Sequence, residues 1–327
     1  MNKNISVVMP VYNAESTIEK ALESLLSQPV QFKAIYIIDD GSTDNSAKKI
    51  KEFSNKYKNI FYIFQDNHGE AGALNTGLKM VKEDFVAVIE GDVVLENDWI
   101  LKLMPYFENE KVAAVSGLTK LANSTNIWSA FGGYNVEYRQ SKIKQEFVDQ
   151  LSTCNTIYRK SVLDKLGLFD GKFTYGLDNE ISYRMIDAGY KLILSKKTFC
   201  LHFWPESFMK YIKQRSHGAL GRMMLIDKYP KRWKGDKVSS LRYFLELPLV
   251  LLLILVLLIS LISQYFLILA GITVFAMYLF QLNEIKFFFK KKKVFIGALL
   301  PFFSLFRSLG WISGIINFYF VKSSIKK

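Results

Sequence analysis

Short apolar runs alternate with stretches of helical spacing over the first part of the chain. Within 14–28, for example, Ile18, Leu22 and Leu25 recur at the spacing of one helix face. Continuous apolar runs bounded by helices are typical of a parallel sheet covered on both faces. The pattern therefore predicts an α/β fold with a mostly parallel sheet. Strands are expected at 5–12, 34–40, 59–65 and 84–90, and helices at 14–28, 43–57, 70–82 and 97–108.

Three of the expected strands end in polar segments. Two carboxylates, Glu90 and Asp92, at the end of a buried strand are costly to leave unpaired, so a positively charged partner is expected there. Ligands of open α/β sheets bind beyond the carboxyl ends of the strands. If the strands are parallel, the three segments form a single site. They are Pro10-Val11-Tyr12-Asn13, Asp39-Asp40-Gly41-Ser42 and Glu90-Gly91-Asp92.

The section 110–204 has a mixed pattern. A helix is expected after Gly176, with Ile181, Met185 and Ile186 facing inward and Gly189 ending the run. Cys154 and Cys200 lack a metal-ligand spacing and are interpreted as reduced cytosolic thiols. No signal peptide is expected, because the first residues lead directly into a strand-like run.

A long uncharged segment follows this part of the chain. From Leu247 to Asn283 there are 37 residues without a charge, too many for one helix across a ~30 Å hydrocarbon core. Two membrane spans joined near Ser263-Gln264 are therefore expected. Ten basic and three acidic residues lie in 205–243, and nine basic and one acidic in 284–327. This positive-inside pattern places both flanks in the cytoplasm and explains the net charge of +13 better than nucleic-acid binding does.

The flanks of the uncharged segment differ in pattern. Residues 206–227 are amphipathic and expected at the membrane surface. The apolar runs 294–306 and 308–321 are separated by Arg307, and each is short for a span. Pro301, Gly310 and Gly314 also disfavour one uninterrupted helix, so a re-entrant or interfacial helix pair is preferred to a third span.

Seven motifs follow one another along the chain: "VVMPVYNAESTIEKALESLLSQ", "IIDDGSTDNS", "HGEAGALNTGLK", "VIEGDVV", "STCNTIYRKSVLDKLGLFD", "GLDNEISYR" and "HFWPESFMKYIKQRSHGALGR". In this order they resemble the family 2 glycosyltransferases, which are inverting enzymes. The resemblance covers about residues 4–220 and implies a GT-A fold, with a Rossmann-like sheet covered by helices on both faces and followed by C-terminal transmembrane helices. The expected divisions are a cytosolic GT-A domain at 1–205, an amphipathic region at 206–243, a transmembrane hairpin at 244–283 and a basic, hydrophobic segment at 284–327.

The resemblance also implies where the donor and a metal ion bind. The second Asp of "IIDD", Asp40, would contact the nucleotide base, and the ring of Tyr12 could stack on it. Glu90-Gly91-Asp92 matches the Asp-x-Asp motif, whose carboxylates hold Mg²⁺ or Mn²⁺ against the donor diphosphate. Asp92 is the expected metal ligand, and Glu90 would either coordinate the ion, directly or through water, or only support the site. His202 is either a third ligand of the metal or diphosphate or a packed histidine. The residues expected to bind the nucleotide sugar are Pro10, Tyr12, Glu15, Asp40, Gly72, Asn75 and Asp92.

The acceptor side is implied by two later motifs. "GLDNEISYR" matches the segment that carries the catalytic Asp, so Asp178 would be the general base for the acceptor hydroxyl. Leu177 replaces the Glu that the family has at that position, and Glu180 matches its helix carboxylate. The Gln-x-x-Arg-Trp motif of processive members is only partly matched, because the Trp is absent. The residues expected to bind the diphosphate or the acceptor are Gln214, Arg215 and His217.

Together these features predict an integral enzyme of the cell membrane with its catalytic domain in the cytoplasm. It would be metal-dependent and inverting, and would move a sugar from a nucleoside-diphosphate sugar, expected to be a UDP-sugar, to a polyprenyl phosphate or a lipid-linked glycan. Two alternatives stay open. One is a processive polysaccharide synthase, and the other is an inactive membrane scaffold that binds nucleotide sugars.

Overall fold

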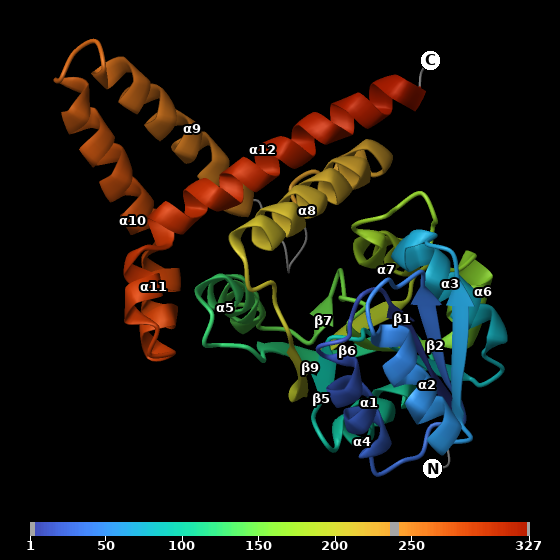
Figure 1. Cartoon of the computed structure of the whole chain (residues 1–327). Helices are drawn as coiled ribbons and strands as arrows, with labels where there is room; N and C mark the ends of the chain where they lie inside the picture. The colour runs from blue at the N-terminus through green and yellow to red at the C-terminus, as the bar shows by residue number, and fades with distance from the viewer. Residues whose placement is uncertain (1–3, 236–241, 326–327) are drawn as a thin grey trace. The chain divides into compact units, whose positions relative to one another are not determined.

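The computed structural model describes residues 4–235 and 242–325 and divides the chain into two compact units. The first unit contains the residues up to Asn123 and Ile143–Phe203, and the second contains Ser124–Lys142 and the residues from Trp204 onward. The sheet lies in the first unit, whereas the second is helical (Figure 1). Residues 124–142 therefore group with the C-terminal helices, although the sequence pattern placed them in the domain at 1–205.

One mixed sheet organises the first unit, in the order β3-β2-β1-β4-β8-β6-β9-β5, with β7 paired to β9. Each strand of its parallel part lies within one or two residues of the strand expected from the sequence, so the predicted parallel core is confirmed. Because these strands run the same way, the segments after β1, β2 and β4 lie at one edge of the sheet. The parallel strands are β1 (Ile5–Val11), β2 (Ile35–Asp40), β3 (Ile60–Gln65) and β4 (Phe85–Ile89).

The other half of the sheet is mixed in direction. Strand β8 runs antiparallel to both β4 and β6, and β9 runs parallel to β6 but antiparallel to β5 and β7. The pairing of β9 with β5 places His202 opposite Val93, one residue after Asp92. These strands are β5 (Val93–Leu95), β6 (Val112–Leu121), β7 (Phe147–Val148), β8 (Asn155–Arg159) and β9 (Lys191–His202).

Helices cover both faces of the sheet, as predicted. Val7 and Met9 of β1 share one core with Ile18 of α1, whereas Val8 points to the opposite face, against Gly77 of α3. A Cβ on Gly77 would lie 2.5 Å from Val8 Cγ1, so the close approach of α3 requires a glycine there. The helices of this unit are α1 (Ile18–Leu26), α2 (Ser46–Lys56), α3 (Gly69–Met80), α4 (Trp99–Leu103), the 3-10 helix η1 (Met104–Glu108), α6 (Lys160–Leu166) and α7 (Leu177–Asp187).

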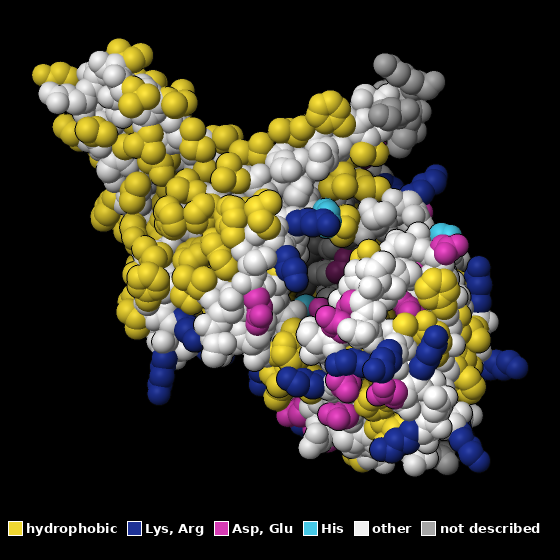
Figure 2. Space-filling model, viewed as in Figure 1, with side chains coloured by type: hydrophobic (Ala, Val, Ile, Leu, Met, Phe, Trp, Pro, Cys, Tyr) yellow, Lys and Arg dark blue, Asp and Glu magenta, His cyan; other side chains and the backbone are white. Residues whose placement is uncertain are grey.

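The second unit is built from helices with many exposed apolar side chains. Among the described residues, Phe266–Lys290 is long and apolar enough to cross a membrane by length and composition, and Leu245–Ser260 is a shorter apolar helix. Apolar side chains cover the visible face of α9 and α10 (Figure 2), which are joined through 261–265, where the sequence predicted a turn. The helices are α5 (Ile127–Ser141), α8 (Phe208–Lys228), the 3-10 helix η2 (Pro230–Arg232), α9 (Arg242–Ser260), α10 (Phe266–Lys290), α11 (Val294–Ala298) and α12 (Leu300–Ile325).

The expected break at Arg307 is wrong, because α12 continues through it. Pro301 is the second residue of the helix, where its missing N–H costs no hydrogen bond. Gly310 and Gly314 lie against α8: a Cβ on Gly310 would be 2.6 Å from Arg215 Cβ, and one on Gly314 would meet the carbonyl of Ser216. These glycines therefore allow close helix packing instead of ending the helix. The guanidinium of Arg307 is buried in an ion pair with Glu246 of α9.

Candidate active site

The loops after β1 and β2 hold each other through a set of hydrogen bonds. The Asn13 side-chain oxygen accepts a hydrogen bond from the backbone N–H of Thr43 at 2.8 Å, and the backbone N–H of Asn13 donates to the hydroxyl of Ser42 at 3.0 Å. The carboxylate of Glu15 accepts from the backbone and side chain of Asn45, at 2.9 and 3.0 Å. Glu15, expected to bind the donor, thus fixes the loop that would surround it.

The two aspartates after β2 hold different loops. Asp39 accepts hydrogen bonds from the Ser42 N–H at 2.9 Å and from the Tyr62 hydroxyl at 2.8 Å, and burial together with Asp39 raises the pKa of Tyr62 to about 12. One oxygen of Asp40 accepts from Gln65 Nε2 at 2.7 Å and from the His68 N–H at 2.9 Å. Asp40 therefore joins β2 to the loop before α3, at the edge where the resemblance expects the nucleotide base.

Two residues expected to bind the donor have structural roles in α3. A Cβ on Gly72 would lie 2.7 Å from His68 Cβ, so this position is limited by packing. The amide of Asn75 donates to the carbonyl of Phe169 at 2.8 Å and accepts from the N–H of the same residue at 3.0 Å. Asn75 therefore ties α3 to the turn after α6, and its donor contact stays a prediction. By contrast, the residue Tyr12 is 55% exposed, so its side chain is accessible for stacking.

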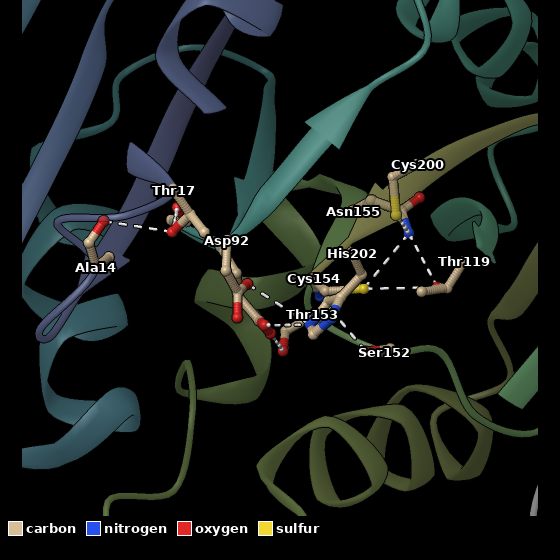
Figure 3. Close-up of polar contacts among 12 residues, drawn as sticks. Ala14, Thr17, Asp92, Thr119, Ser152, Thr153, Cys154, Asn155, Cys200 and His202 are labelled. Carbon is tan, nitrogen blue, oxygen red and sulfur yellow. Dashed lines mark hydrogen bonds and ion pairs between the residues drawn. The ribbon is translucent and has the colours of Figure 1, made fainter. Parts of the chain in front are cut away.

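Glu90, Asp92 and His202 come together at the ends of β4 and β9. One ligand atom from each lies within 4.8 Å of the others, about the separation of two ligand atoms on opposite sides of one ion. His202 Nε2 is 3.5 Å from a Glu90 oxygen and 3.6 Å from Asp92 Oδ1. Figure 3 shows Asp92 and Thr153 beside His202. Two carboxylates and an imidazole are a suitable ligand set for Mn²⁺, and carboxylates alone suit Mg²⁺.

The electrostatics of this triad also fit a cation. Burial alone would lower the pKa of His202, but the negative charges of Asp92 and Glu90 outweigh it and raise that pKa to about 10. Burial raises the pKa of Asp92 to about 6 despite the nearby His202. Asp92 Oδ1 is buried and makes no hydrogen bond with the described residues. Without an ion, the proton of His202 therefore serves as the positive partner of both carboxylates.

A further carboxyl group, Glu70, was missed by the sequence reading. The hydroxyl of Thr153 lies 3.2 Å from both Glu70 Oε1 and Glu90 Oε1. Burial, and then the charges of Glu90 and Asp178, raise the pKa of Glu70 well above its usual range. Its place in the first turn of the helix after β3 was the available signal, because that turn lies at the same sheet edge.

Asp178 lies in the first turn of α7, after Gly176 with its positive φ of 77°. Its Oδ1 accepts from the N–H of Asn179 at 2.8 Å, and its Oδ2 accepts from Gln150 Nε2 at 3.2 Å. The charge of Asp178 contributes, after burial and the charge of Glu90, to raising the pKa of Glu70. Sequence reasoning selected Asp178 but not Gln150.

The other carboxylate of this motif, Glu180, has a structural role. It is fully buried and accepts a hydrogen bond from Arg184 Nη2 at 2.6 Å. Arg184 in turn donates to the carbonyls of Leu166 and Leu168. Leu177, which replaces the family's Glu, is buried in the core.

The three residues expected to bind the diphosphate or the acceptor all lie on α8 of the second unit. Arg215 Nη2 donates to Gln214 Oε1 at 2.6 Å, and its guanidinium lies 5.2 Å from the centre of the Tyr211 ring. Burial, and then the charge of Lys213, lower the pKa of His217. The role of Gln214, Arg215 and His217 in binding substrate stays a prediction.

Sequence comparison connects this site to known enzymes. Residues 6–167 match the model of the glycosyl transferase family 2. Curated relatives include the poly-beta-1,6-N-acetyl-D-glucosamine synthases of Staphylococcus aureus, 28% identical over 67% of this chain and 54% of theirs, and of Staphylococcus epidermidis, 28% identical over 70% and 57%. The chain thus spans about half the length of the curated relatives it matches.

Structural comparison supports the fold. The mannosyltransferase PcManGT from Pyrobaculum calidifontis, solved with GDP-Man and Mn²⁺, has a TM-score of 0.61, 15% identity, and coverage of 95% of this chain and 87% of that one. GalNAc-T7, solved with UDP, GalNAc and Mn²⁺, has a TM-score of 0.51, 14% identity, and coverage of 67% and 50%. Residues 6–167 therefore form a glycosyl transferase family 2 domain, and the fold is the GT-A fold.

Proposed function

We propose that this protein is a metal-dependent, inverting glycosyltransferase that uses a nucleoside-diphosphate sugar at a membrane surface. The observation that carries the proposal is the arrangement of four carboxyl groups and one histidine at a single sheet edge. Glu90, Asp92 and His202 form one group, and Asp178 lies on a separate helix, connected to them electrostatically through Glu70. A metal-bound leaving group and a separate base are the two elements that a single displacement needs.

The donor would lie across the loops after β1, β2 and β4. Tyr12 supplies an exposed ring for the nucleotide base, and Asp40 supplies a carboxylate that can accept from a base N–H. Glu90, Asp92 and His202 would hold Mg²⁺ or Mn²⁺, which when bound offsets the negative charge of the departing nucleoside diphosphate. The nucleotide is expected to be UDP, as in the reading of the sequence.

Asp178 would take the proton from the acceptor hydroxyl as the new glycosidic bond forms. Its carboxylate accepts hydrogen bonds from Asn179 and Gln150, which stabilise the ionised form that a base needs. Because Asp178 would activate the acceptor directly, the sugar undergoes one displacement and its anomeric configuration inverts.

The acceptor is proposed to be attached to a lipid, either a polyprenyl phosphate or a lipid-linked glycan. The apolar helices α9 and α10 favour an integral protein, and basic segments on both sides of them favour a catalytic domain in the cytoplasm. The names of the staphylococcal relatives favour a second candidate, a processive synthase of β-linked N-acetylglucosamine. A ladder of products on a gel would identify that alternative, whereas a single added sugar would support one transfer.

The proposal can be tested with the full-length protein in detergent or nanodiscs. A panel of UDP- and GDP-sugars is supplied with Mn²⁺, Mg²⁺ or EDTA, and the released nucleoside diphosphate is measured. Asp178→Asn should abolish turnover but keep nucleotide binding, whereas Asp164→Asn, an exposed carboxylate paired with Lys160, should behave as wild type. Wild-type turnover in EDTA or in Asp178→Asn would reject the corresponding part of the mechanism.

A further inference from the structure

Gln150 lies beside the proposed base but was not selected by any motif. It stands between β7 and β8, and its side chain is buried, with 7% of the residue exposed. Its Nε2 donates to Asp178 Oδ2 at 3.2 Å. The N–H of Asn179 donates to Oδ1, so both oxygens of the Asp178 carboxylate accept hydrogen bonds from the protein.

The loop that carries Gln150 is held on both sides of it. Val148 of β7 pairs with Leu192 of β9, two residues before Gln150. The N–H of Leu151, one residue after it, donates to the hydroxyl of Ser182 on α7 at 3.2 Å. Because Ser182 lies one helical turn beyond Asp178, the same contact fixes Gln150 relative to the carboxylate. The amide is therefore presented to Asp178 by a supported backbone.

The amide of Gln150 is poorly explained by stability alone. Its carbonyl oxygen, Oε1, is buried and has no hydrogen-bond partner within 4–235 or 242–325. An unsatisfied buried acceptor costs more than one moderate hydrogen bond returns. An apolar side chain of the same shape would avoid this cost, so the benefit of the amide must come from its N–H donor. Such locally unfavourable groups occur where a functional side chain has to be oriented.

We propose that Gln150 is a positioning residue for Asp178. It acts through the carboxylate and does not touch the transferred sugar. Its N–H holds Oδ2 and so fixes the direction in which the carboxylate faces the acceptor hydroxyl. A donor to the ionised form also favours that form. Burial and, after it, nearby charges that include Asp178 raise the pKa of Glu70 on α3 and of Tyr158 on β8, so both groups face the carboxylate in their neutral forms. This inference rests on the proposed role of Asp178 as the base.

The test compares two nearly isosteric variants, Gln150→Met and Gln150→Glu, in the full-length protein. Both lack the N–H donor, and Gln150→Glu adds a negative charge beside Asp178. For Gln150→Met, kcat should fall about tenfold or more, while the KM for the donor should stay within about twofold of the wild-type value. The acidic limb of the kcat/KM profile should move to higher pH by about half a unit or more. Gln150→Glu should move this limb further in the same direction, with part of the activity restored at high pH.

Gln28 provides a matched control, because it is a buried glutamine of the same unit with structural partners. Its amide donates to the carbonyls of Ser24 and Glu96 and accepts from the N–H of Ile100. Gln28→Met should lower the melting temperature but keep the pH profile. Gln150→Met should not lower the melting temperature, since it removes an unsatisfied buried oxygen, but it should change the pH profile.

The outcomes separate the two proposals. An inactive Asp178→Asn together with wild-type kcat and pH profile in Gln150→Met or Gln150→Glu would reject only the role of Gln150. Full activity in Asp178→Asn would reject the base and, with it, the positioning role. If Gln150→Met does not fold, Gln150→Glu still decides, because an unchanged profile in that variant contradicts the proposal.

Discussion

Mn²⁺ affinity should rise steeply with pH, because the proposed ion has to replace a proton on His202. Burial opposes the charged imidazolium, but Asp92 and Glu90 outweigh it and raise the pKa of His202 to about 10. At neutral pH the imidazole is therefore protonated, and its nitrogen has no lone pair for a metal. Asp92, with a pKa of about 6, is already ionised in this range.

The magnitude follows from the number of protons displaced. Between about pH 6 and pH 10, one proton leaves for each ion bound, so the apparent association constant should rise about tenfold per pH unit, or about 1.4 kcal/mol. From pH 6.5 to 8.5 the gain is about a hundredfold. Below about pH 6, Asp92 is also protonated, so the affinity should fall with a slope approaching two protons.

Isothermal titration calorimetry with Mn²⁺ at pH 6.5, 7.5 and 8.5 measures both quantities. Two buffers of different ionisation enthalpy at each pH give the number of protons released. His202→Gln should bind more weakly at pH 8.5 and lose the slope, whereas His68→Gln, an exposed histidine, should keep it. An affinity that changes less than about threefold across this range, or a proton count near zero, would refute the reasoning.

Three further predictions concern the ligands and the packing. Asp92→Asn should weaken Mn²⁺ binding more than Glu90→Gln in the same calorimetry, and equal losses would contradict the unequal roles. Asn75→Leu removes two hydrogen bonds to the Phe169 backbone and should lower the free energy of unfolding by about 2 kcal/mol in urea titrations; an unchanged midpoint would oppose this. Gly77→Val should destabilise the fold strongly, because even a Cβ would clash with Val8, and a wild-type melting temperature would disprove that packing.

The fold was predictable because its signal is local. Each parallel strand is a continuous apolar run, and each run is followed by helical spacing, so both element types were located within a few residues. The predicted break in α12 was wrong because Gly310 and Gly314 pack against α8, which is distant in the sequence. Their missing side chains make room for α8, and a pattern of residues along one helix does not reveal which neighbour it meets.

The candidate site combines local and distant features in the same way. Short motifs at strand and helix ends pointed to Glu90, Asp92 and Asp178, and the roles of these residues stay predictions. Asn75 matched a motif too, but its amide is engaged by Phe169, 94 residues away. Glu70 and Gln150 gave weak signals, because a single carboxyl or amide gains its role only from the groups around it.

By itself, the sequence determined the parallel sheet, the edge at which its polar segments end and the apolar helices near the C-terminus, because these depend on periodicity and strand direction. Only the tertiary structure decided that β9 brings His202 beside Asp92, that Thr153 joins Glu70 to Glu90 and that Gln150 holds Asp178. These contacts depend on strand pairing and on side-chain distances of about 3 Å, which one-dimensional patterns do not specify.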